Sequence, residues 1–168
     1  MKIQTVHRIT GKHLLLDGFG AGIWLDCSPS ASMCSHLDEG LIRLGWAHHS
    51  YQIHHHSHGS VVVVSAPVDQ LYTACELLEW AAGKHCDFDV VLKEQQQERN
   101  PQWVQVRRYA EQNKWPVLDD EDGLTLGYGK YSITYPLDKL PTLDDLSQLE
   151  PRRIPVGYIT GTNGKTTT

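Results

Sequence analysis

The sequence predicts an α+β fold in which helices pack on a small mixed sheet. One observation is the order of the predicted elements over residues 1–83: strand, strand, helix, strand, strand, helix. The other is composition, because 40% of the 168 residues are hydrophobic and 21% are charged. Such a chain can bury enough apolar surface to offset the entropy lost on folding. A chain of this length forms about one complete domain, so we expect any attached part to be partial.

The first strands and the first helix follow from local patterns. Residues 2–8 alternate in side-chain character, residues 10–13 predict a turn, and residues 22–26 predict a second strand. Residues 28–30 offer N-cap side chains for a helix that ends at Gly45. The apolar positions of this helix are Met33, Leu37, Leu41 and Leu44.

The next segment predicts a hairpin and the helix with the strongest apolar pattern. Residues 51–56 and 60–65 form the arms of the hairpin, with the turn at residues 57–59. The helix begins near Pro67 and ends near Gly83. One stripe of this helix carries Leu71, Cys75, Leu78 and Ala82.

The second half of the chain predicts shorter elements. Two helices are expected, at residues 88–97 and 102–114, separated by Asn100 and Pro101. Short strands are expected at residues 116–118, 124–127 and 131–135. Residues 136–153 contain three prolines and several acidic residues, so we expect a linker with at most one helical turn.

The end of the chain has the composition of a phosphate-binding loop that follows a strand. Residues 154–159 are a short apolar segment, and residues 160–168 read Thr-Gly-Thr-Asn-Gly-Lys-Thr-Thr-Thr. Gly161 and Gly164 allow a tight turn in which successive N–H groups point at an anion. Lys165 can place an ammonium between the outer phosphates, and the Thr166 hydroxyl can bind Mg²⁺.

This loop departs from the usual Walker A pattern. That pattern has four residues between its glycines, whereas Gly161 and Gly164 are separated by two, and Ile159 stands where the first glycine would be. The shorter form Gly-Thr-Asn-Gly-Lys-Thr-Thr resembles the ATP-binding signature of the Mur ligase family. Weaker similarity to bacterial family proteins related to cyanophycin synthetase extends to residues 8–11, 14–15, 65–72, 79–80 and 98–101. Such relatives often carry Pro-Asn where this chain has Lys12 and His13.

The resemblance implies an ATP-dependent ligase that forms an amide bond. Such enzymes use ATP and Mg²⁺ to convert a carboxylate into an acyl phosphate, which an amine then attacks. The implied partners are therefore a nucleotide and a small carboxylate or amine substrate. The implied ATP-binding residues are Gly161, Thr162, Asn163, Gly164, Lys165, Thr166 and Thr167, with Thr166 also the metal ligand. No catalytic residue is assigned.

The resulting domain plan has three parts. An N-terminal α+β domain is expected at residues 1–135, a linker at residues 136–153, and the first strand and loop of a truncated α/β nucleotide-binding domain at residues 154–168. We expect this chain to be an N-terminal fragment that is inactive alone. The alternative is a stand-alone interaction or regulatory module with a non-catalytic phosphate-loop remnant.

Charge and hydropathy argue against nucleic acid and membrane as partners of this chain. The 15 basic and 20 acidic residues give a net charge of −5, which argues against a general nucleic-acid binder. The apolar run at residues 61–64 is far shorter than the roughly 18 residues of a membrane span. The N-terminus has no apolar stretch typical of a secretory signal. We therefore expect a cytoplasmic protein, and we expect its four cysteines, which form no C-x-x-C pair, to be reduced thiols.

Four other features have a structural and a functional interpretation. The histidines His48, His49, His54, His55, His56 and His58 predict a polar strand surface, with a Zn²⁺ or Ni²⁺ site as the alternative. Glu76 and Glu79 could act as paired carboxylates, but a solvated helix face is expected. Trp80, Trp103 and Trp115 are expected in a core or domain interface. Residues 119–122 predict an acidic turn and lack the longer pattern of a calcium loop.

Overall fold

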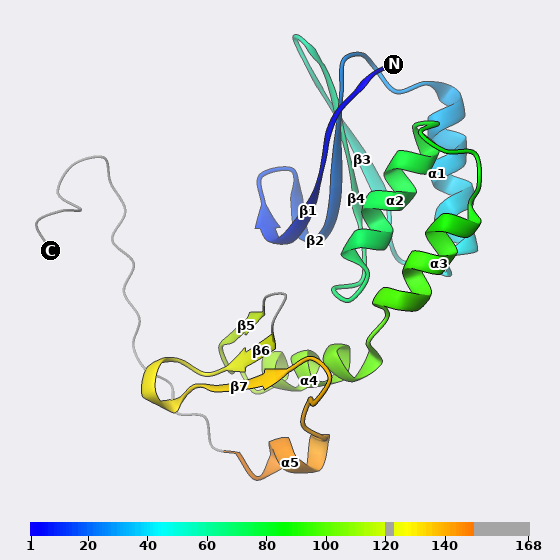
Figure 1. Cartoon of the computed structure of the whole chain (residues 1–168). Coiled ribbons are helices and arrows are strands. Elements are labelled where there is room, and N and C mark those ends of the chain that lie inside the picture. Colours follow the sequence, from blue (N-terminus) through cyan, green and yellow to red (C-terminus); the bar gives the residue numbers. More distant parts are fainter. Residues whose placement is uncertain (120–122, 150–168) are drawn as a thin grey trace, which may run out of the picture. The chain divides into compact units, whose positions relative to one another are not determined.

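The computed structural model describes residues 1–119 and 123–149 (Figure 1). The chain divides into two compact units, Met1–Asn100 and Pro101–Thr168. This division falls between the two helices of the middle segment, and the expected first domain at residues 1–135 spans all of unit 1 and part of unit 2. In the described part of the chain, no helix is both long enough and apolar enough to cross a lipid bilayer.

Unit 1 is an antiparallel sheet with helices on one face (Figure 1). The strands are β1 (Ile3–His13), β2 (Leu16–Leu25), β3 (Tyr51–His56) and β4 (Gly59–Ser65), and the helices are α1 (Ala31–Arg43), α2 (Leu71–Ala81) and α3 (Asp89–Glu98). Their arrangement confirms the α+β class.

The prediction of a mixed sheet is wrong, because every strand pair in the sheet of unit 1 is antiparallel. The order in the sheet is β1-β2-β4-β3. The crossover through α1 makes β2 and β3 run in the same direction, but the hairpin places β4 between them. Each strand therefore has only antiparallel neighbours.

The first hairpin is longer than expected. The segment predicted as a turn, residues 10–13, continues β1 and pairs with β2 as far as His13 opposite Leu16. The turn instead lies at Leu14 and Leu15, and Leu14 is 95% exposed. Gly11 suggested the turn, yet it pairs with Gly18 inside the ladder.

Strand β4 is buried on both faces and supplies the centre of unit 1. Val62 and Val64 join the main core with α1 and α2, whereas Val61 and Val63 pack with Ile9 and other residues in a smaller cluster. Gly59 begins this strand with φ +145°, and a Cβ there would lie 1.9 Å from the carbonyl oxygen of Leu25. Only glycine fits this turn.

The start of α1 and the ends of α1 and α2 follow the expected sequence signals, whereas α2 begins at Leu71 and not near Pro67. Ser30 caps α1 by accepting a hydrogen bond from the N–H of Met33 at 3.1 Å. Gly45 adopts φ +72° just after α1, and Gly83 adopts φ +81° just after α2. At α2 the N–H of Gly83 donates to Trp80 O at 2.9 Å and the N–H of Lys84 donates to Glu79 O at 3.0 Å. This pair is a Schellman motif, which reverses the chain after the helix.

Unit 2 has a three-stranded antiparallel sheet and two helices within its described residues. The helices are α4 (Pro101–Gln112) and α5 (Leu143–Ser147), the strands are β5 (Val117–Asp119), β6 (Gly123–Leu126) and β7 (Ile133–Pro136), and a 3₁₀ turn, η1, covers Gly129–Tyr131. The sheet order is β5-β6-β7. The buried residues of its core are Val106, Ala110, Leu124, Leu126, Leu140 and Leu146.

The segment expected as a linker contributes to this core as far as Leu149. Leu140 and Leu146 are buried, and Leu137 and Leu149 pack against them. The helix α5 is stabilised by a capping box between Thr142 and Asp145. Asp145 belongs to the cap of α5, while Leu140 and Leu146 on either side of it point inward. Residues 150–153 of the expected linker lie outside the described residues.

Truncation of Leu146 tests whether this segment belongs to the core. Leu146 is 0% exposed, so Leu146→Ala should destabilise unit 2 by about 2 to 5 kcal/mol. Leu143, in the same helix, is 45% exposed, and Leu143→Ala should cost less than about 1 kcal/mol. Hydrogen exchange of the β6 amides measures both effects. Equal, small losses in the two variants would contradict the core assignment.

Candidate functional site

The predicted ATP site lies outside the described residues. This applies to Gly161, Thr162, Asn163, Gly164, Lys165, Thr166 and Thr167, and also to the predicted strand at residues 154–159. The described residues instead bring together polar groups around the two ends of α2.

The N-terminus of α2 is capped by a carboxylate from another helix. Gln70 occupies the N-cap position but its side chain makes no capping bond. Glu98, the last residue of α3, accepts hydrogen bonds from the N–H groups of Tyr72 at 2.7 Å and Thr73 at 2.8 Å. The Thr73 hydroxyl also donates to Glu98, at 2.8 Å. The negative charge thus lies at the positive end of the α2 dipole.

Burial has a larger effect on this carboxylate than its hydrogen bonds have. Removal from water raises the pKa of Glu98, and the bonds from Thr73 and Tyr72 partly oppose that rise. One turn further along α2, burial and the charge of Glu79 raise the pKa of Cys75 to about 12. This thiol therefore stays protonated near neutral pH and is a poor nucleophile.

A buried network beside this cap connects the three helices. Asp69 is 2% exposed and accepts a hydrogen bond from the N–H of Asn100 at 2.9 Å. The side-chain oxygen of Gln70 accepts bonds from Trp46 Nε1 at 3.2 Å and Gln95 Nε2 at 2.8 Å. Gln95 also donates to the carbonyl of Leu44, at 3.1 Å. The end of α1, the start of α2 and the end of α3 are fixed together by these bonds.

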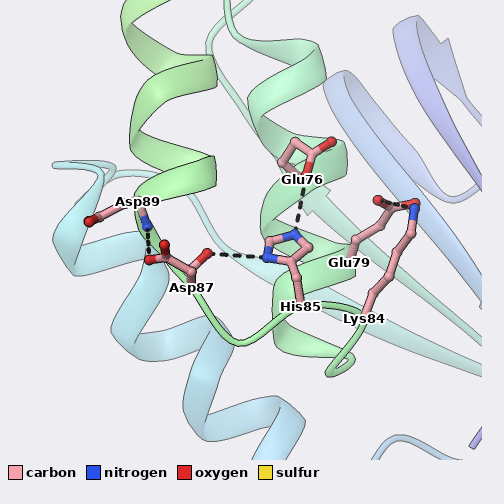
Figure 2. Close-up of polar contacts among 6 residues, drawn as sticks. All are labelled: Glu76, Glu79, Lys84, His85, Asp87 and Asp89. Atoms are coloured by element: carbon pink, nitrogen blue, oxygen red, sulfur yellow. Dashed lines mark hydrogen bonds and ion pairs between the residues drawn. The ribbon is translucent and has the colours of Figure 1, made fainter.

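The two glutamates expected on a solvated helix face have partners and are partly buried. Figure 2 shows Glu76 beside His85 and Glu79 beside Lys84. The distances are 3.2 Å from His85 Nε2 to Glu76 Oε2 and 2.7 Å from Lys84 Nζ to Glu79 Oε2. The Glu79 side chain is only 16% exposed. Helical spacing alone could not indicate these contacts, because both partners follow the reversal at Gly83.

The structure does not gather the clustered histidines into a metal site. Among the described residues, which include all six, no group of three potential ligands is close enough to hold a metal ion. His55 Nδ1 lies 3.0 Å from Ser60 Oγ, and His49 Nδ1 lies 3.3 Å from Ser65 Oγ. Burial, with a smaller effect from His48, lowers the pKa of His49.

The tryptophan prediction is confirmed. Trp80 lies in the main core of unit 1, and Trp103 and Trp115 pack against the core of unit 2. Asp119, at the start of the acidic run, forms a hydrogen-bonded ion pair with Arg107. The remaining acidic residues at 120–122 lie outside the described residues.

Unit 2 also has a hollow of about 320 Å³ beside α4 and α5. It is lined by Gln102, Gln105, Val106, Pro141, Thr142 and Leu143. The Gln102 amide is already bonded to the carbonyl of Leu140 at 2.8 Å. None of the described side chains that line the hollow is charged.

Comparison of the chain with protein-family models, curated proteins and solved structures found no match.

No pattern in the sequence indicates that Glu98 or His85 contacts another element. Glu98 stands out there only as part of residues 98–101. The structure brings that segment against residues 65–72, since Glu98 caps the helix that begins there and Asn100 binds Asp69. A long-range contact of this kind has no periodic signal in a single sequence.

Removal of the Glu98 carboxylate should destabilise unit 1. Glu98→Ala leaves two N–H groups and one hydroxyl without their acceptor, so the free energy of unfolding should fall by about 1 to 3 kcal/mol. Glu94→Ala on the same helix is the matched control and should change it by less than about 0.5 kcal/mol. Urea unfolding measures both variants. Losses of equal size would show that the cap contributes nothing specific.

The raised pKa of Glu98 also predicts how the free energy of unfolding changes with pH. The folded protein binds the Glu98 proton more tightly than the unfolded chain does. The stability that results is therefore fully present below the ordinary pKa of 4.5 and is lost as pH rises through the folded pKa. Wild type should therefore lose stability relative to Glu98→Gln between about pH 4 and about pH 6. Urea unfolding across this range provides the test. A relative gain by wild type would mean that the hydrogen bonds outweigh burial.

Proposed function

We propose that this chain supplies the N-terminal α+β region and the phosphate-binding loop of an ATP-dependent ligase that forms amide bonds. One observation carries the proposal: the contiguous Gly-Thr-Asn-Gly-Lys-Thr-Thr at residues 161–167, directly after the apolar residues 154–159. Its residue order resembles the ATP-binding signature of the Mur ligase family. The described polar clusters support a scaffolding role for unit 1, since they connect its helices to one another.

The residues of the loop suit transfer of a phosphoryl group to a carboxylate. In that reaction a carboxylate oxygen attacks the γ-phosphorus and ADP leaves. An amine then attacks the acyl carbon and loses a proton, and phosphate departs. Backbone N–H groups at Gly161–Gly164 and the ammonium of Lys165 would stabilise the negative charge of the transferring group. Thr166 would hold Mg²⁺, which neutralises phosphate charge when bound.

We also place the protein in the cytoplasm. ATP and Mg²⁺ are abundant there, and a reducing environment suits the free cysteines. The carboxylate and the amine are small molecules in this proposal, and nucleic acid and membrane are not partners.

Substitution of Lys165 tests the proposal in the protein at the full length that its gene encodes. Lys165→Ala removes the ammonium from the phosphates, so kcat/KM for ATP should fall about 10²-fold or more. The assay follows ADP and phosphate release that requires both a carboxylate and an amine. The matched control is Lys93→Ala, an exposed lysine on α3, which should leave turnover unchanged.

Two results would overturn the ligase assignment. One is equal turnover in Lys165→Ala and Lys93→Ala. The other is the lack of any MgATP binding by the wild-type protein in isothermal titration, which would favour the interaction module with a non-catalytic loop.

A further inference from the structure

His85 lies in the connection between α2 and α3, with its ring between two hydrogen-bond acceptors. Nδ1 is 3.2 Å from the backbone carbonyl oxygen of Asp87, and Nε2 is 3.2 Å from Glu76 Oε2 (Figure 2). The Schellman turn at Gly83 produces this position, because it directs the chain back alongside the last turns of α2. The imidazole is partly buried, with 23% of its side chain exposed.

The two acceptors require two donors. A carbonyl oxygen and an ionised carboxylate only accept, and a neutral imidazole carries a single N–H. A neutral His85 can therefore satisfy one of the two contacts, and only the imidazolium can donate to both at once. We propose that His85 is a pH-dependent latch that ties the α2–α3 connection to α2 when protonated and releases one of its two contacts when neutral.

The charged groups around the latch are mostly acidic. Glu79 is paired with Lys84, and Asp87 Oδ1 accepts the N–H of Asp89 at 2.9 Å. Glu76 forms an ion pair with the protonated His85 ring, and it can form only a hydrogen bond with the neutral ring. The elements packed against α2 and the connection carry further ionisable side chains. They include Cys75 of α2, Cys86 of the connection, Asp89, Lys93, Glu94 and Glu98 of α3, His36, Asp38, Glu39 and Arg43 of α1, and Arg8 of β1.

The latch acts on the start of α3. Phe88 follows Asp87 and packs edge-on against Trp80, with ring centroids 4.6 Å apart, and Arg43 lies 3.9 Å above the Phe88 ring. The opposite end of α3 is held by the Glu98 cap, which does not involve His85. Deprotonation of His85 therefore loosens the connection locally while the α2 cap and the main core stay in place.

Hydrogen exchange tests this latch directly. The amides of Lys84 and Asp89 are bonded in the folded protein and report on the connection. In wild type their protection factors should fall about fivefold or more from about pH 5.5 to about pH 8, the range in which histidine titrates. In His85→Gln and Glu76→Gln the fall should be absent. His58→Gln, which alters an exposed histidine in the β3–β4 turn, should behave as wild type.

A second measurement on wild type needs no variant to fold. In ¹⁵N NMR near pH 5.5, both ring N–H groups of His85 should be visible and slow to exchange, because both are held by acceptors, whereas those of exposed His58 should not. The proposal is overturned if either His85 ring N–H is absent under these conditions. It is equally overturned if His85→Gln shows the same fall in protection as wild type.

Discussion

The packing of unit 1 depends on one carboxylate that α2 receives from the far end of α3. The first turn of α2 has no side-chain cap of its own, and Glu98 supplies the acceptor for two N–H groups and a hydroxyl. This contact holds the last residue of α3 against the first turn of α2, and the bond from Asn100 to Asp69 fixes the chain just beyond it. Together these contacts hold α2 and α3 against each other at one end, and the chain reversal at Gly83 connects the two helices at the other end.

The parts of the fold that a single sequence predicts are those with local causes. The leucines of α1 recur at helical spacing, Ser30 and Gly45 mark its ends, and the hairpin of β3 and β4 follows from the polar turn that precedes the valine-rich strand β4. Each of these signals acts within a few residues, and the structure confirms them.

The parts that could not be predicted depend on distant partners. The order β1-β2-β4-β3 depends on the pairing of β2 with β4, which lie far apart in the sequence, and no local pattern encodes it. Leu140 and Leu146 are separated by turn residues, so they look like an ordinary linker until α4 and β6 provide a surface for them. For the candidate site, the residue order at 161–167 predicts phosphate binding, but no pattern in the sequence identifies residues that would bind another substrate.

The central position of β4 constrains the order of events during folding. Both hairpins, β1 with β2 and β3 with β4, close over short loops and can form early. The pairing of Leu25 with Ser60, which joins them, must close a loop that contains α1 and β3, and its entropic cost is recovered only when Val62 and Val64 meet the helices. We therefore expect the joining of the two hairpins to be the slowest step in the folding of unit 1, with its four-stranded sheet forming together with its helical layer.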